Sequence, residues 1–250
     1  MNTITLTREK IYEGELILIN AVRPLRCVRT EELVPVKAGY PDILLNRKAA
    51  GMLQTLLDAL GAAGEIVPVS GYRSHEEQTE LYRNSLKENG AEFTRKFVAL
   101  PDRSEHQTGL AIDVGSCSEK SEKIDFLCPD FPYEGICEKF RGLAPDYGFI
   151  QRYPAGKEKL TGIAHEPWHF RYVGFPHSAI MADRGLTLEE YIAFIKRYTP
   201  ERRLAFRNTE IFFFPAVAPY TEIQLPEDAL YQISGNNTDG FIVTVWGDSR

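Results

Sequence analysis

The chain is organised around the segment Ser104-Glu105-His106-Gln107-Thr108-Gly109-Leu110-Ala111-Ile112-Asp113, which places an imidazole and a carboxylate seven residues apart. A histidine nitrogen and an aspartate oxygen are two of the donors that zinc prefers. Catalytic zinc sites usually take three protein ligands and leave one coordination position open. The segment therefore predicts a metal site with His106 and Asp113 as ligands, and a third ligand must come from elsewhere in the chain.

A second cluster of histidine and glutamate lies downstream, at His165-Glu166-Pro167-Trp168-His169. It matches the string H-E-x-x-H, in which a helix presents two histidines to zinc and a glutamate as base. Proline opposes this interpretation, because inside a helix it removes a backbone donor and costs about 3 kcal/mol. The following residues, 170–173, also favour a strand. We therefore expect His169 alone to complete the ligand set, with the two-histidine motif as the alternative.

Glu166 and Arg73 are the expected catalytic residues. Strand alternation would place Glu166 and His169 on opposite faces, but Pro167 breaks the regular pleat and lets Glu166 turn toward the metal. There it can take a proton from a water whose pKa zinc lowers toward about 7. Arg73, between a short strand and a helix start, offers a fixed cation to the charge that develops on an attacked carbonyl oxygen. These residues indicate metal-assisted amide hydrolysis.

The pattern of apolar residues predicts helices and strands in mixed order. Helices are expected over 45–60, 74–90, 133–147, 176–183 and 187–198, and strands over 15–21, 66–69, 109–114, 148–150 and 166–173. Ser74 and Glu77 have the spacing of a capping box. Residues 91–103 show no periodicity and are expected to form a loop. Short β-rich runs at 211–214, 220–225, 229–233 and 240–246 predict an appendage over residues 199–250, after a catalytic domain over residues 1–198.

Composition narrows the class of protein. The 250 residues are 43% apolar and carry a net charge of −6, which is typical of a folded globular protein and argues against nucleic-acid binding. We expect a cytoplasmic protein, because the sequence shows neither a secretory signal nor a long apolar run. The four cysteines are expected to be free thiols, although Cys117, Cys128 and Cys137 share one stretch and leave a structural metal or a disulfide open.

Three motifs in order resemble the zinc D-alanyl-D-alanine peptidases of the VanY, VanX and VanXY type. The motifs are Ser70-Gly71-Tyr72-Arg73-Ser74, Ser104-x-His106-x-x-Gly109-x-Ala111-x-Asp113 and Glu166-x-x-Trp168-His169-x-Arg171. The resemblance implies zinc ligands at His106, Asp113 and His169, with Glu166 as catalytic base and Arg73 as stabiliser of the transition state. It also implies that Gln78 and Ser104 bind the terminal carboxylate of the substrate.

The same resemblance implies an α+β fold, in which a central antiparallel sheet flanked by helices carries the zinc site. The implied reaction is hydrolysis of D-Ala-D-Ala dipeptide, or removal of the terminal D-Ala from peptidoglycan precursors, which confers resistance to glycopeptides such as vancomycin. The expected lack of an anchor favours the VanXY type. Ser70 stands where dipeptidases tend to carry an acidic residue, so at this substrate-binding position the chain resembles carboxypeptidases. The alternatives are an L-Ala-D-Glu endopeptidase and a non-catalytic, zinc-stabilised cell-wall binding module.

Overall fold

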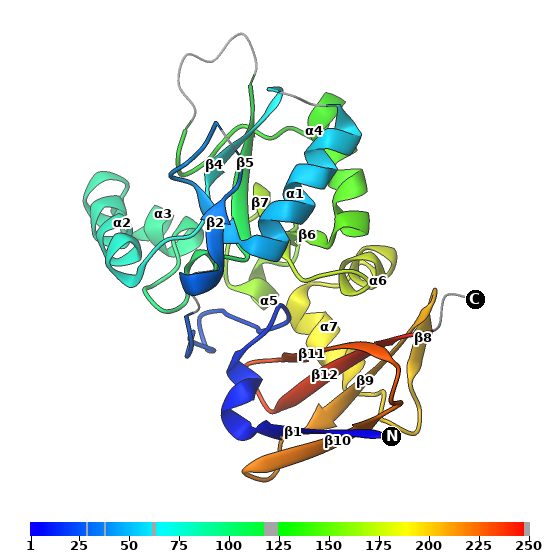
Figure 1. Ribbon diagram of the computed structural model, residues 1–250. Helices are drawn as coiled ribbons and strands as arrows, with labels where there is room; N and C mark the ends of the chain where they lie inside the picture. The colour runs from blue at the N-terminus through cyan, green and yellow to red at the C-terminus, as the bar shows by residue number, and fades with distance from the viewer. Residues whose placement is uncertain (29, 38, 62–63, 118–124, 248–250) are drawn as a thin grey trace. The chain divides into compact units, whose positions relative to one another are not determined.

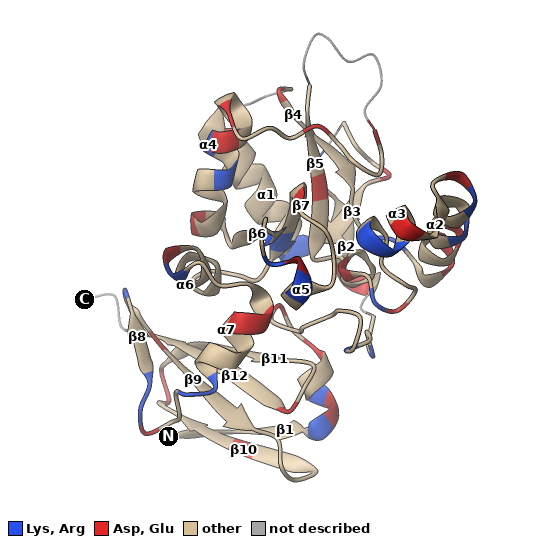
Figure 2. Cartoon of the chain, turned by 180° about the vertical axis from the view of Figure 1, so that it is seen from behind, with Lys and Arg blue, Asp and Glu red and all other residues tan. Residues whose placement is uncertain are grey.

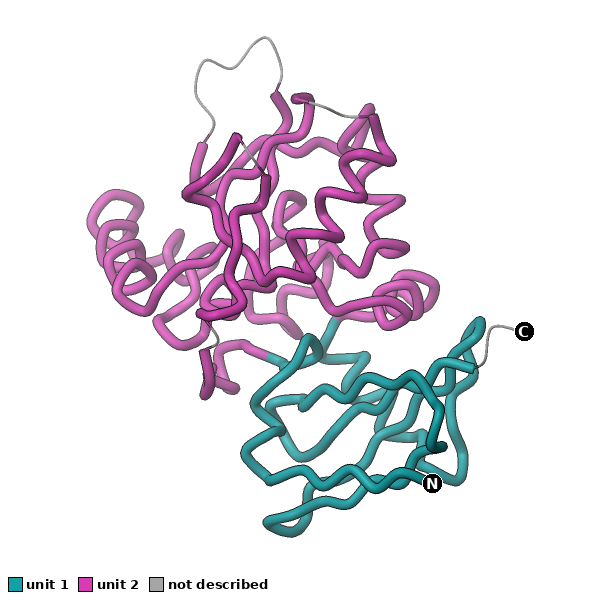
Figure 3. The backbone as a smooth tube through the Cα atoms, viewed as in Figure 1, with its two compact units in different colours: residues 1–18, 188–250 teal, residues 19–187 magenta. Residues whose placement is uncertain are grey.

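Residues 1–28, 30–37, 39–61, 64–117 and 125–247 are described by a computed structural model. Their contacts divide the chain into one unit of residues 19–187 and a second unit that joins residues 1–18 to residues 188–250 (Figure 3). The second unit thus includes the N-terminus as well as the expected β appendage. The division into a catalytic domain of residues 1–198 and an appendage of residues 199–250 stays a prediction.

The unit of residues 19–187 is built on a four-stranded antiparallel sheet (Figure 1). Its strands, in spatial order, are β4 (Ile66–Ser70), β5 (Ala111–Ser116), β7 (Glu166–Tyr172) and β6 (Phe149–Tyr153). In the register of β5 and β7, Ile112 lies opposite Phe170 and Asp113 lies opposite His169. Because side chains alternate along a strand, the first pair faces one side of the sheet and the second pair faces the other.

Two helices cover the apolar face of this sheet, α1 (Arg47–Leu60) and α4 (Gly135–Leu143) (Figure 1). The Asn46 side chain caps α1 by accepting the backbone N–H of Lys48, and Gly61 ends the helix with a φ of 63°. Leu53 of α1 and Phe140 of α4 belong to the same buried core as Ile112 and Phe170. Burying each side chain of this size contributes about 1.5–3 kcal/mol, so this face anchors the sheet.

The helices α2 (His75–Glu88) and α3 (Gly90–Phe97) follow β4. Ser74 and Glu77 form the expected capping box at the start of α2. The expectation of a loop over residues 91–103 is wrong in its first half, because α3 occupies residues 90–97. Phe93 and Phe97, four residues apart, pair their rings at 4.8 Å on one side of this short helix. Figure 2 shows acidic and basic residues mixed along both helices.

Shorter elements complete this unit. The strands β2 (Leu33–Pro35) and β3 (Leu44–Asn46) pair with each other. The helices are α5 (Glu158–Thr161) and α6 (His177–Arg184), together with the 3-10 turns η2 (Thr30–Glu32), η3 (Glu105–Thr108) and η4 (Ala144–Tyr147). The four cysteines are free.

The second unit is mostly β-structure. It contains η1 (Arg8–Tyr12), α7 (Leu188–Ile195) and a sheet in the order β11 (Leu230–Gly235), β12 (Gly240–Trp246), β9 (Thr209–Pro215) and β8 (Leu204–Phe206). A separate ribbon pairs β1 (Asn2–Thr7) with β10 (Tyr220–Leu225). All four predicted β runs are confirmed, and the overall class is α+β as expected.

The strand expected at residues 15–21 is not present. Leu16, Ile17, Leu18 and Ile19 are buried, but their backbone forms no ladder. Instead, the N–H of Leu16 donates to the Ser234 hydroxyl at 2.9 Å, and the N–H of Leu18 donates to the carbonyl of Asn236 at 3.3 Å. Within the described part of the chain, no helix combines the length and the apolar character needed to cross a bilayer.

Candidate metal centre and active site

The turn η3 and the strands β5 and β7 bring the predicted ligands together on the polar face of the sheet. His106 lies in η3, and Gly109 ends that turn with a φ of 69° before the chain enters β5. This positive φ disfavours any residue with a Cβ, and a Cβ at Gly109 would also lie 3.2 Å from the backbone N of Asn46, so the tight turn favours glycine. Asp113 and His169 then face each other across the β5–β7 register.

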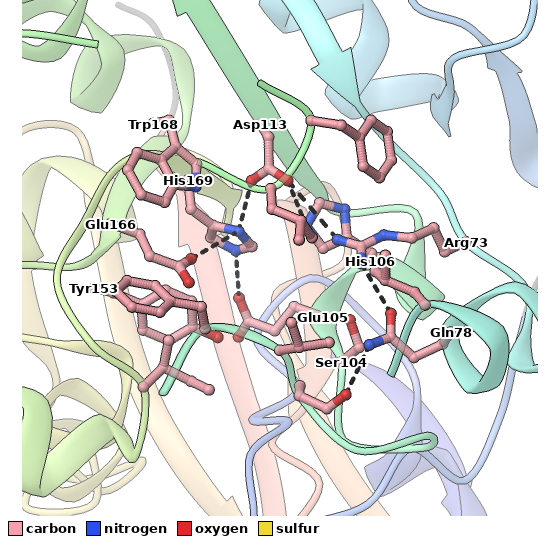
Figure 4. Close-up of a pocket in the computed structure, with 17 residues that line it drawn as sticks. Arg73, Gln78, Ser104, Glu105, His106, Asp113, Tyr153, Glu166, Trp168 and His169 are labelled. Carbon is pink, nitrogen blue, oxygen red and sulfur yellow. Dashed lines mark hydrogen bonds and ion pairs between the residues drawn. The ribbon is translucent and has the colours of Figure 1, made fainter. Parts of the chain in front are cut away.

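His106, Asp113 and His169 form a buried metal-ligand triad (Figure 4). The His106 Nε2 lies 3.2 Å from Asp113 Oδ2, and the His169 Nδ1 lies 2.9 Å from Asp113 Oδ1. One ligand atom from each residue lies within 4.8 Å of the other two. Among the residues with described positions, this is the only such group of histidine, cysteine and acidic side chains.

The electrostatics of the triad fit a bound cation. Burial, with a smaller contribution from Arg73, lowers the pKa of His106 to about 4, so this imidazole is neutral, as a metal ligand must be. Burial alone would lower the pKa of His169 too, but Asp113, Glu105 and Glu166 outweigh burial and raise the pKa to about 9. The surrounding carboxylates therefore favour a positive charge at this point, and two imidazoles with one carboxylate are a donor set that suits zinc.

Glu166 lies beside the triad because β7 is irregular around Pro167. Gln151 pairs with Phe170 and Tyr153 pairs with Glu166, so β7 carries extra residues relative to β6. Glu166 and His169 consequently line the same pocket, with 3.7 Å between Glu166 Oε2 and His169 Nδ1. Burial raises the pKa of Glu166 to about 8. A general base is most effective when its pKa lies near the pH at which the enzyme operates.

Arg73 reaches the pocket from the segment between β4 and α2. Its Nη2 lies 3.8 Å from Asp113 Oδ2, and its Nη1 donates a hydrogen bond to Gln78 Oε1 at 3.0 Å. Gln78 is itself fixed, because its Nε2 donates to the carbonyl of Ala99 at 2.7 Å. The guanidinium is therefore held in place beside the triad rather than free in solvent.

The pocket also contains most of the other residues named from the sequence. Gln78 and Ser104 line it, together with an apolar wall of Leu81, Phe97, Phe126, Leu127, Ile163 and Trp168. Ser70 is buried in β4, where it pairs with Asp113, and it does not line the pocket. His165 lies outside the triad, and its Nε2 is 2.6 Å from the Tyr133 hydroxyl. The geometry thus brings His169, and not His165, to the other two ligands.

Glu105 is a site residue that the sequence did not single out. It is 1% exposed, and its Oε1 accepts a hydrogen bond from Arg152 Nε at 2.9 Å and lies 3.2 Å from Arg171 Nη1. Burial alone would raise the pKa of Glu105, but the two arginines hold it well below its usual range. The sequence offered only an indirect signal, the arginines Arg152 and Arg171 within strands, because buried arginines need a carboxylate partner without the sequence showing which one.

The fold and the site define a metal-dependent peptidase, with two histidines, one aspartate and an adjacent glutamate on an antiparallel sheet. Residues 42–175 match the family model of VanY, D-alanyl-D-alanine carboxypeptidase. The chain belongs to this family.

Relatives with named activities match between 70% and 98% of the chain. It is 45% identical to the bifunctional D-Ala-D-Ala dipeptidase and D-Ala-D-Ala carboxypeptidase VanXYC of Enterococcus gallinarum, over 70% of this chain and 92% of that protein. The crystal structure of the vancomycin resistance D,D-dipeptidase VanXYg, in complex with a D-Ala-D-Ala phosphinate analog, is similar over 98% of both chains, with 54% identity and a TM-score of 0.95. A mutant of the D,D-pentapeptidase VanY from a VanB-type resistance cassette, in complex with Zn(II), covers 71% of this chain and 98% of that one, at 30% identity and a TM-score of 0.55.

Proposed function

We propose that this protein is a zinc-dependent D,D-peptidase that hydrolyses the D-Ala-D-Ala dipeptide and also removes the terminal D-Ala of peptidoglycan precursors. The observation that carries the proposal is the position of Glu166, buried 3.7 Å from His169 in a pocket that also holds Arg73. A purely structural metal site has no need of such a base. The similarity to VanXYC and VanXYg supports both substrates.

Zinc is the proposed cofactor, held by His106 Nε2, the Asp113 carboxylate and His169 Nδ1. When bound, zinc supplies a Lewis acid that polarises a carbonyl and lowers the pKa of water at that position to about 7. The Zn(II) complex of the related VanY supports this choice of metal.

The residues around the triad have distinct proposed roles. Glu166 accepts a proton from the attacking water and returns it to the leaving amine nitrogen. Arg73 faces the carbonyl oxygen and stabilises the negative charge that develops there. Gln78 keeps one Nε2 hydrogen beyond its bond to Ala99, and the Ser104 hydroxyl is a further donor, so both suit the substrate carboxylate.

Loss of D-Ala-D-Ala ends would deprive vancomycin of its target, so we propose a role in glycopeptide resistance. A cytoplasmic location fits the hydrolysis of soluble precursors and stays a prediction. Ser70 remains a proposed determinant of the preference between substrates. From β4 it would act through its neighbour Asp113, because it does not itself line the pocket.

The test is release of D-Ala from D-Ala-D-Ala and from a pentapeptide precursor, with and without a chelator. Both substrates should be cleaved, the chelator should stop both reactions, and Glu166→Gln should retain zinc while losing turnover. Cleavage of an L-Ala-D-Glu peptide instead would support the endopeptidase alternative. Binding of peptidoglycan fragments without turnover would support the binding module.

A further inference from the structure

Two buried polar atoms on the outer side of the triad face each other without a hydrogen bond. Glu105 Oε2 and His169 Nε2 each have no hydrogen-bond partner within the described residues, and 3.6 Å separates them. Leaving such atoms unpaired in a protein interior is costly. A small movement of either side chain would bring the two atoms within hydrogen-bond distance.

The two ligand histidines present different nitrogens to the metal site. His106 directs Nε2 inward, and its Nδ1 donates to the carbonyl of Gly71 at 2.6 Å. His169 directs Nδ1 inward, toward Asp113, so its Nε2 points away from the site toward Glu105 (Figure 4). The outer nitrogen of each ring thus faces an oxygen atom, which belongs to a backbone carbonyl for His106 and to a carboxylate for His169.

Glu105 is well fixed for this contact. Arg152, from β6, and Arg171, from β7, approach its Oε1 at 2.9 and 3.2 Å. The side chains of all three residues have no exposed surface. With Oε1 engaged by two cations from neighbouring strands, Oε2 is left directed at the imidazole.

We propose that Glu105 is a positioning residue, whose Oε2 accepts the Nε2–H of His169 and thereby keeps Nδ1 unprotonated and aimed at the metal. A carboxylate on the outer nitrogen fixes the ring orientation and makes the ligand nitrogen a better donor. Arg152 and Arg171 hold the carboxylate in place. The inference rests on the proposed function, because it requires that His169 binds zinc.

The test is the zinc dissociation constant of the full chain, measured by competition with a chelating indicator. Losing an outer carboxylate of this kind weakens metal binding by about 10–100-fold, so Glu105→Gln should show a loss of this size. Glu166→Gln is the matched control, because it removes the same charge at 3.7 Å from the inner nitrogen of the same ring. It should weaken zinc binding less than Glu105→Gln does.

Three outcomes separate this inference from the proposed function. A wild-type protein that binds no zinc would overturn the proposed function. Unchanged zinc affinity in Glu105→Gln, with wild-type binding intact, would overturn only the role of Glu105. Equal losses in Glu105→Gln and Glu166→Gln would reduce the effect to net charge and would also overturn that role.

A measurement on the wild-type protein covers the case in which Glu105→Gln does not fold. Nitrogen-15 NMR of the zinc-loaded, histidine-labelled protein reports which ring nitrogen carries the proton. His169 should show a protonated Nε2 and an unprotonated Nδ1. The opposite tautomer would contradict the proposal.

Discussion

Replacing Arg73 by methionine removes the guanidinium beside the triad while keeping an unbranched side chain of similar length. In the structure, Arg73 Nη2 lies 3.8 Å from Asp113 Oδ2. At that separation two unit charges interact by about 4 kcal/mol at an effective dielectric constant near 20. An oxyanion at a similar distance carries only part of a charge, so about 3–4 kcal/mol is an upper range for the stabilisation. That corresponds to a loss of about 10²–10³ in kcat, as for removal of one oxyanion donor.

The effect should fall on kcat and leave KM almost unchanged, because the carbonyl oxygen is neutral in the ground state. The assay is steady-state release of D-Ala, with zinc content measured on the same preparations. Arg73→Lys is the matched control: it retains the charge but loses the planar fork that bonds Gln78, and should recover part of the lost rate. A zinc-loaded Arg73→Met with kcat less than about tenfold below wild type, or with only a raised KM, would refute the role of Arg73.

Two further substitutions test the scaffold. A Cβ at Gly71 would lie 2.3 Å from the carbonyl oxygen of Leu44, so Gly71→Ala must shift residue 71, whose own carbonyl accepts from His106. We expect this variant to lose about 1–3 kcal/mol of stability in chemical denaturation. Gly51→Ala, at an open position of α1, should instead gain about 0.5–1 kcal/mol. Equal changes in stability for Gly71→Ala and Gly51→Ala would contradict this expectation. Burial lowers the pKa of His177 to about 3, so the unfolded chain binds the extra proton first, and wild-type stability should fall as pH drops from about 6.5 toward 3. His177→Gln should flatten that slope by up to about 1.4 kcal/mol per pH unit in denaturation titrations, and an unchanged slope would rule out a buried neutral imidazole.

Local signals in the sequence were sufficient for several elements. Helix α1 follows from apolar residues at helical spacing before Gly61, and the start of α2 follows from the capping box of Ser74 and Glu77. Both signals depend on residues within a few positions of each other. Helix α3 was missed, because a single pair, Phe93 and Phe97, carries the apolar side of only two turns.

Elements that depend on distant partners could not be predicted in the same way. Strand β1 alternates polar and partly buried residues, but its partner β10 lies at the other end of the chain. Residues 15–21 are apolar enough for a strand, yet their buried backbone bonds the Ser234 hydroxyl and the Asn236 carbonyl instead of a neighbouring strand. Burial was predictable there, whereas the hydrogen-bond partners were not.

The site residues also divide into those that local sequence signals predict and those that depend on distant partners. The spacing of His106 and Asp113, with the proline in the second motif, was enough to predict the residues that form the triad. Glu105 was not predictable, because a glutamate in a short polar turn is usually exposed. Its burial depends on Arg152 and Arg171, which come from two strands far along the chain.

We expect one zinc ion to be held by His106, Asp113 and His169. Elemental analysis of the purified wild-type protein, of His165→Ala and of His106→Ala measures this. The wild type and His165→Ala should each contain about one zinc ion per chain, and His106→Ala should lose it. Loss of zinc from His165→Ala, or a wild-type protein that binds no zinc when the metal is supplied, would contradict the account.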